Sequence, residues 1–367
     1  MKFVGEYPKE VKKLLIASLV SGINTVIISE PGWGKTEMAL TTAQNVAPDG
    51  TVFIELDPST PPETIKGTYD PAKMLDGKLE RIITGTPYDP QAKIVILDEV
   101  WRANDVVFDA LIHATAPKLV SPLERPIFWG TANWVNKSER NAALRDRFGL
   151  YMFLEGDLNA EEIVSEQLKN GMWDISWADD VPRWDECIKI RKEKPTKRSE
   201  DAVRAIVSTL VAEASKPADE KIMRPRFTVN PRRVGQWSEI LFRLSVYYTG
   251  RANFDDASQA AEMLKYAYPI LDKKTARDWH EITVSIANSF GSILDAIVQQ
   301  CEMRAFEISS GSQSGTETVT KIANIIREAL SNAKKACGDF NLTDKDPRYK
   351  NAEKRLNKVM SKSLRGE

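Results

Sequence analysis

The stretch SEPGWGKT, at Ser29–Thr36, decides the fold that this sequence predicts. It follows a short apolar, β-branched run at residues 24–28 and precedes a helical pattern at residues 35–46. A loop between a strand and a helix is a context in which proteins bind phosphate groups. Gly32 and Gly34 let the backbone curl so that its N–H groups converge on an anion, and the start of the helix adds a favourable dipole. We therefore predict a phosphate-binding loop at this position.

The loop also carries the side chains that a nucleoside triphosphate needs. Lys35 can place a positive charge on the outer phosphates, and the Thr36 hydroxyl can bind Mg²⁺. Ser29 stands where such loops usually have their first glycine, so a chance GKT sequence in an ordinary loop is the alternative. We expect the following residues to contact the nucleotide: Pro31, Gly32, Trp33, Gly34, Lys35, Thr36 and Glu37.

A second motif, KIVILDE at Lys93–Glu99, supports the first. It is an apolar strand that ends in two carboxylates. Asp98 is expected to hold Mg²⁺, directly or through water, and Glu99 to polarise the attacking water. Adjacent acids at a strand end also occur as solubilising caps, but a strand of this kind downstream of a GKT loop favours a nucleotide site.

The order of elements along the chain predicts two kinds of structure. The first part alternates short apolar strands with helices, which indicates a parallel sheet covered on both faces. Helical patterns dominate after the strands end, with an irregular linker or insertion at residues 171–198 and a highly charged end that is either a solvated helix or a frayed tail. The predicted strands are at residues 24–28, 51–56, 93–97, 126–131 and 150–154, and the later helices are at 159–170, 199–215, 231–248, 255–268, 276–307 and 316–338.

Composition places the chain among globular proteins and restricts its partners. With 42% hydrophobic and 28% charged residues, its 367 residues can bury more than one core. The formal net charge of −1 provides no overall attraction to nucleic acid or an anionic membrane. Three widely spaced cysteines and two histidines argue against a disulfide framework, a zinc site and a Ser-His-Asp triad. We expect a cytoplasmic protein without a membrane or nucleic-acid partner.

The ordered series of motifs resembles the MoxR-type AAA+ ATPases over roughly residues 10–270. LLIASLVSGINTVIISEPGWGKT resembles the opening of that family, in which a glycine-tipped helix precedes the first strand. Further segments are similar in order, namely Asp57–Pro71, the helix-2 insert hairpin at Gly77–Tyr88, the helix at Leu97–Ala114 and GTANW at Gly130–Trp134. The resemblance implies a P-loop AAA+ αβα sandwich with a parallel five-stranded sheet, an all-α lid and a helical C-terminal extension, at residues 1–156, 157–275 and 276–367.

The same resemblance implies roles for residues outside the two motifs. Asn133 matches the first sensor, which hydrogen-bonds the attacking water or the γ-phosphate. Arg147 falls where the family has its arginine finger, which reaches the nucleotide of the neighbouring subunit, and Arg145 is the close alternative. Arg232 matches the second sensor on the lid, with Arg233 as the alternative if the register slips by one. Together with Glu99, we expect Asn133, Arg147 and Arg232 to form the catalytic set.

Three features depart from the MoxR pattern. Trp101 stands where the family commonly has a small polar residue, and Trp33 lies in the phosphate loop, where it can stack near the nucleotide or pack on a neighbouring subunit. The segment Asn133–Arg147 is short, which is similar to the dynein-related and McrB-like branches of the same clade. Because the McrB-like branch uses GTP, we prefer ATP as the nucleotide but leave GTP open.

The resemblance therefore implies hydrolysis of ATP with Mg²⁺ by a homo-oligomeric ring, hexameric in the family, that remodels or activates a partner protein. The partner is a separate client or a protein with a von Willebrand A (vWA) domain. Two alternatives stay open. One is a nucleotide-gated scaffold that hydrolyses little, against which the intact Glu99 argues. The other is a GTP- or ATP-driven nucleic-acid motor, against which the near-neutral charge argues.

Overall fold

The computed structural model divides the chain into two compact units. The first comprises Met1–Glu193 and Tyr266–Arg277, and the second comprises Lys194–Lys265 and Asp278–Glu367. The three-domain division at residues 156 and 275 stays a prediction. The residues that the structure describes are 7–116, 123, 125–134, 142–154, 181–217, 227–249, 264–268, 277–283, 297–298, 301, 305, 315–339 and 347–365.

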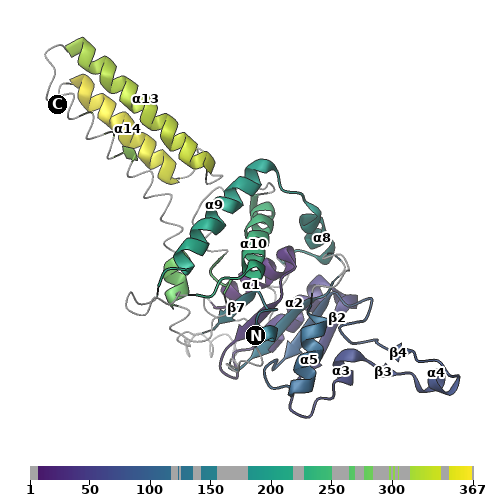
Figure 1. The fold of residues 1–367 in the computed structure, drawn as a ribbon. Helices are drawn as coiled ribbons and strands as arrows, with labels where there is room; N and C mark the ends of the chain where they lie inside the picture. Colours follow the sequence, from purple (N-terminus) through teal and green to yellow (C-terminus); the bar gives the residue numbers. More distant parts are fainter. Residues whose placement is uncertain are drawn as a thin grey trace, which may run out of the picture. The chain divides into compact units, whose positions relative to one another are not determined.

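A five-stranded sheet lies at the centre of the first unit (Figure 1). Its strands are β1 (Thr25–Ile28), β2 (Thr51–Glu55), β5 (Ile94–Asp98), β6 (Ile127–Ala132) and β7 (Leu150–Phe153). The strand order is β2-β5-β6-β1-β7, and every neighbouring pair is parallel. The central strands β1, β5 and β6 are buried almost throughout, which is why their sequences are continuous apolar runs. The predicted parallel five-stranded sheet is confirmed.

Helices cover both faces of this sheet and complete an αβα sandwich. They are α1 (Tyr7–Ser21), α2 (Lys35–Val46), the short 3-10 helix η1 (Pro48–Gly50), α5 (Asp105–Ala114) and α6 (Ala142–Arg145). Successive strand residues point to opposite faces. Phe128 accordingly joins the apolar cluster formed with α5 and α6, whereas the Trp129 indole donates to the Ser18 hydroxyl of α1 at 2.9 Å. This packing holds the carboxyl ends of the strands in fixed register.

Between β2 and β5 the chain forms an arm that extends away from the sheet (Figure 1). It consists of β3 (Thr68–Tyr69), α4 (Pro71–Leu75) and β4 (Arg81–Ile82), and the short helix α3 (Glu63–Lys66) precedes it. β3 pairs with β4 in antiparallel fashion, and Asp70 caps α4 by accepting the N–H of Ala72 at 2.9 Å. The hairpin predicted at residues 77–88 is therefore misplaced. It runs over residues 68–82, because the capped helix α4 occupies its tip. We call residues 68–82 the arm.

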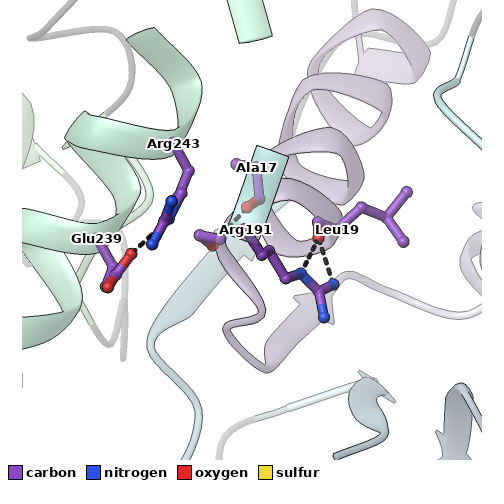
Figure 2. A network of polar contacts seen from close by, with 6 residues as sticks. Ala17, Leu19, Arg191, Glu239 and Arg243 are labelled. Carbon is purple, nitrogen blue, oxygen red and sulfur yellow. Dashed lines mark hydrogen bonds and ion pairs between the residues drawn. The ribbon is translucent and has the colours of Figure 1, made fainter. Parts of the chain in front are cut away.

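The prediction of an irregular linker at residues 171–198 is wrong in part, because α8 (Trp184–Lys192) lies within it. This helix is stabilised at its ends rather than by a strong apolar period. The Glu186 carboxylate accepts the N–H of Arg183 at 2.9 Å, acids occupy the first turn, and bases occupy the last. The buried Arg191 guanidinium donates from Nε to the Leu19 carbonyl at 2.8 Å, which joins α8 to the end of α1 (Figure 2).

The second unit is helical in its described parts. Its helices are α9 (Lys197–Ala214), α10 (Pro231–Thr249), α13 (Gly315–Asp339) and α14 (Pro347–Arg365). An aromatic cluster forms part of its core: the Trp279 ring lies 5.2 Å from that of Phe227 and 5.6 Å from that of Trp237. On α10, Arg243 pairs with Glu239 at 2.8 Å (Figure 2).

Of the highly charged C-terminal residues, those that the structure describes, 347–365, form a helix. Helices α13 and α14 lie side by side (Figure 1), and apolar residues of both are buried. The predicted helix at residues 159–170 and most of those at 255–268 and 276–307 lie outside the described residues. Within the described residues, no helix combines the length and the hydropathy that a membrane span requires.

Candidate nucleotide site

The predicted site residues of the first unit meet at one edge of the sheet. β5, β6 and β1 are neighbours and run in the same direction, so the residues that follow these strands come together. Ligands of open parallel sheets bind at the carboxyl ends of the strands, where the strand order reverses. Asp98 ends β5, Asn133 follows β6, and Lys35 begins the helix after β1. The fold thus gathers three distant motifs.

The loop after β1 has the backbone that phosphate binding requires. Gly32 and Gly34 have φ angles of +87° and +69°, which L side chains rarely adopt. Gly34 is also the N-cap of α2, so the loop leads directly into a helix N-terminus. Ser29, at the usual glycine position, is buried and donates its N–H to the Ala132 carbonyl at 3.1 Å. The buried position at the end of the strand therefore accommodates a serine in place of the usual glycine.

Lys35 lies buried between the loop and the end of β6. Its ammonium donates to Asn133 Oδ1 at 2.6 Å and to two main-chain carbonyls of the loop at 3.3 and 3.4 Å. Burial lowers the pKa of Lys35, and the negative charges of Glu99 and Asp98 act in the opposite direction. A lysine held here is positioned to neutralise phosphates that rest on the loop.

Thr36 and Asp98 present two oxygen ligands side by side. The Thr36 hydroxyl donates to Asp98 Oδ1 at 2.6 Å, and the Thr131 hydroxyl donates to the same carboxylate oxygen. Hydroxyl and carboxylate oxygens are the hard donors that Mg²⁺ prefers, and Mg²⁺ commonly combines one or two protein carboxylates with substrate phosphates. The donor set beside the phosphate loop therefore fits Mg²⁺ bound together with a nucleotide.

Glu99 and Asn133 complete a hydrogen-bonded network at this edge. Asn133 Nδ2 donates to Glu99 Oε1, while Asn133 Oδ1 accepts from Lys35. The Glu99 backbone has a φ of +56° and donates its N–H to Thr131 Oγ1 at 3.2 Å. The structure thus joins the lysine of the loop, the second acid and the predicted sensor through direct contacts.

Thr131 and Asn24 belong to this part of the fold but were not predicted from the sequence. Thr131 lies two positions before Asn133, and alternate strand residues share a face, so this spacing was a usable signal. Asn24 precedes β1, where its Oδ1 accepts the N–H of Phe128 at 3.0 Å and its Nδ2 donates to the Arg147 carbonyl at 3.1 Å. A lone asparagine before a strand indicates a turn, so the sequence carried no signal for this contact.

The backbone of Arg147 lies at the amino ends of the strands, whereas the phosphate loop lies at their carboxyl ends. Its carbonyl contacts Asn24, before β1, whereas the loop follows β1. β1 has four residues, so roughly 13 Å of strand separates the two levels at about 3.3 Å per residue. Arg145 ends α6, and its carbonyl accepts the Tyr151 hydroxyl at 2.6 Å. The backbones of both candidate fingers therefore lie away from the site of their own chain.

The two candidate second sensors lie in the second unit, in the first turn of α10. Asn230 caps this helix by accepting the N–H of Arg233 at 2.9 Å, and Pro231 is its first residue. Arg233 is 4% exposed, whereas Arg232 is exposed. Arg232 is therefore the one available to a ligand at the surface of this unit.

The unusual tryptophans have different environments. Trp101 is 2% exposed and packs edge-on against Phe148, with ring centroids 6.1 Å apart. It belongs to the apolar cluster under α5, where a small polar residue would leave a cavity. Trp33 is half-buried within the loop, and Glu37 is exposed on the first turn of α2. Trp101 is therefore a core residue rather than a ligand-binding one.

One comparison with known proteins, that with family models, agrees with this geometry. The family model that matches is described as the MoxR domain in the MoxR-vWA-beta-propeller ternary systems, and it matches residues 1–186. Among solved structures, the chain is similar to a candidate ATPase from Cytophaga hutchinsonii, with 18% identity and a TM-score of 0.46 over 78% of this chain and 82% of that one. No curated protein matches. The family model spans half of the chain and includes every site residue of the first unit. The chain therefore belongs to the MoxR-like AAA+ ATPases.

Proposed function

We propose that this chain hydrolyses ATP with Mg²⁺, acts as a homo-oligomeric ring, and remodels or activates a partner protein. The observation that supports hydrolysis is the network at the carboxyl edge of the sheet. It joins Lys35, Asn133 and Glu99 in series, next to the Thr36–Asp98 pair. Membership of the MoxR-like family supports the same conclusion.

The residues of this network have separate tasks in phosphoryl transfer. The backbone of the loop and Lys35 bind the outer phosphates and keep the γ-phosphate in line for attack. Thr36 and Asp98 would hold Mg²⁺, which would supply neutralisation of the phosphate charge. The reaction has little covalent chemistry for the protein to perform, so these positioning contacts are its main contribution.

Glu99 orients the water molecule that attacks the γ-phosphate. Its carboxylate is an acceptor for the hydrogen bond of that water, and Asn133 holds the carboxylate through Oε1. Because the same Asn133 contacts Lys35, the position of Glu99 depends on the lysine that binds the phosphates. This link favours attack by the water when Lys35 binds the phosphates of the same nucleotide that Glu99 faces.

The position of Arg147 supports a ring of identical subunits. An arginine finger must reach the γ-phosphate, and the backbone of Arg147 lies at the amino edge of its own sheet, beside Asn24. We infer that Arg147 serves the nucleotide of a neighbouring subunit, with Arg145 as the alternative. Arg232, exposed at the start of α10, is assigned to the γ-phosphate of the bound nucleotide as the second sensor, with Arg233 as the alternative. Six subunits is the number expected from the family.

The arm is the proposed contact with the partner protein. Large apolar side chains are exposed at its tip: Met74 by 51%, Leu75 by 90% and Leu79 by 76%. Lys73 Nζ lies 3.5 Å from Glu80 Oε2 beside them, and the three basic side chains of the arm balance its three acidic ones. An apolar, internally neutral tip favours a protein surface over nucleic acid. The family description names a vWA component, and we propose a vWA-domain protein as the partner.

Substitution of the second acid tests the proposed hydrolysis. We expect Glu99→Gln to bind ATP about as tightly as the wild type but to lose turnover by about 10²-fold or more, because the amide cannot act as a base. Turnover of ATP and GTP with Mg²⁺ and binding of labelled ATP would be measured for both proteins. Wild-type protein that binds nucleotide but turns it over no faster than Glu99→Gln would contradict hydrolysis.

A further inference from the structure

The hydroxyl of Thr131 contacts both acids of the site at once. Thr131 lies in β6, fully buried and in register with Ile27 of β1. Its hydroxyl donates to Asp98 Oδ1 and accepts the N–H of Glu99 at 3.2 Å. A hydroxyl has a single proton to donate, so that proton is committed to Asp98. One side chain therefore orients the carboxylate of one acid and the backbone of the other.

The two contacts restrain the Asp98 carboxylate and the Glu99 backbone, and both groups need a defined orientation. Asp98 Oδ1 also accepts the Thr36 hydroxyl at 2.6 Å, so two hydroxyls converge on one oxygen and restrict rotation of the carboxylate. Glu99 has a φ of +56°, a left-handed conformation that is costly for a residue with a Cβ. The main chain of Thr131 adds a third contact, because its carbonyl accepts the N–H of Val100 at 2.9 Å. The turn that carries Glu99 is thus bonded both to the side chain and to the main chain of Thr131.

We propose that Thr131 is a positioning residue for the nucleotide site. Its hydroxyl keeps Asp98 in the orientation that binds Mg²⁺ and keeps Glu99 in the turn that directs its carboxylate to the attacking water. Thr131 acts through these two acids and not on the nucleotide itself. The inference rests on the proposed function, because it assigns to Thr131 the support of acids whose roles that function defines.

Two substitutions of Thr131 separate the hydroxyl from the shape of the side chain. Thr131→Val removes the hydroxyl at nearly constant volume, and Thr131→Ser keeps it. Thr25→Val is the matched control, because Thr25 is buried in the adjacent strand and its hydroxyl has no hydrogen-bond partner among the described residues. Should Thr131→Val fail to fold, Thr131→Ala replaces it in the comparison with Thr131→Ser.

The first readout does not depend on turnover. Binding of adenylyl imidodiphosphate, a non-hydrolysable ATP analogue, is measured as MgCl2 is varied and again in EDTA. Residues that orient metal ligands commonly affect metal affinity or activity by about 10–100-fold. We therefore expect Thr131→Val to need roughly 10–100-fold more MgCl2 for half-maximal binding, with its affinity in EDTA unchanged. Its kcat for ATP falls by a similar factor, and Thr131→Ser and Thr25→Val remain near the wild type.

Two results would overturn the inference. One is a Thr131→Val protein that matches Thr25→Val in its MgCl2 dependence. The other is a Thr131→Ser protein as impaired as Thr131→Val, since the hydroxyl would then be irrelevant. Wild-type protein without any Mg²⁺-dependent binding of the analogue contradicts the proposed function, and the inference falls with it. If the wild-type protein binds the analogue in a Mg²⁺-dependent way and Thr131→Val has the same MgCl2 dependence, the inference is contradicted but the proposed function is not.

Discussion

At the scale of single residues, the site depends on side chains that use both of their hydrogen-bonding ends. Asn133 accepts from Lys35 through Oδ1 and donates to Glu99 through Nδ2. An aspartate at this position would keep the first contact but would face Glu99 with a second negative charge. A leucine would break both contacts. The amide is therefore the side chain that fits between a cation and a carboxylate.

Thr25 provides a contrasting case at the same scale, because its buried hydroxyl has no hydrogen-bond partner among the described residues. Burying an unsatisfied hydroxyl costs roughly 1–3 kcal/mol. We predict that Thr25→Val raises the free energy of unfolding by about 1 kcal/mol, measured by urea unfolding. Thr42→Val is the control, because the buried Thr42 hydroxyl donates to the Met38 carbonyl at 2.7 Å and its loss should destabilise. A Thr25→Val protein less stable than the wild type would contradict this account.

At the scale of elements, the strands that are buried on both faces could be predicted from the sequence. β1, β5 and β6 are continuous apolar runs, and their register brings the two acids and the sensor to one edge. The loop and its helix were predicted from Gly32, Gly34 and Lys35 together with the apolar run before them and the helical pattern after them. The network between them was not, because hydrogen bonds such as that from Lys35 to Asn133 join residues far apart in sequence.

The elements that the sequence did not predict are those with weak apolar patterns. α8 depends on its capping glutamate, its end charges and the buried Arg191 rather than on a strong apolar stripe. The strands of the arm have two residues each and are exposed, so no alternation marks them. Contacts of single side chains, such as those of Thr131, leave no periodic signal at all.

The arm carries a prediction of its own. If Leu75 and Leu79 serve a partner rather than the fold, replacing both with serine changes the free energy of unfolding by no more than about 1 kcal/mol, because a single exposed site usually contributes within about 0.5 kcal/mol. Leu111→Ala, in the core cluster under α5, is the control and should cost about 2–5 kcal/mol. Urea unfolding measures both. A loss from the arm variant as large as that from the control would show that these leucines stabilise the fold.

At the scale of the whole molecule, the sheet separates the residues of the two proposed functions. Its carboxyl edge holds the phosphate loop and the acids, and its amino edge holds Asn24 and the backbone of Arg147. A subunit built in this way can offer a finger to a neighbour while it binds its own nucleotide. Repeating this head-to-tail contact produces a ring when the rotation between subunits closes. The central claim is therefore that each active site is shared between two chains.

A mixing experiment tests this claim most directly. Arg147→Ala removes the finger, and Glu99→Gln removes the acid, so each variant alone should hydrolyse ATP at least about 10²-fold more slowly than the wild type. In a mixture, an Arg147→Ala subunit beside a Glu99→Gln subunit restores one interface with both groups intact. Random mixing at equal amounts makes roughly a quarter of the interfaces complete in a closed ring.

Turnover of each variant alone and of mixtures at several ratios is the measurement, with light scattering to confirm that mixed assemblies form. We expect recovery to as much as about a quarter of the wild-type rate, with a maximum near equal amounts. No recovery at any ratio, in folded and mixed assemblies, would contradict a shared site that uses Arg147.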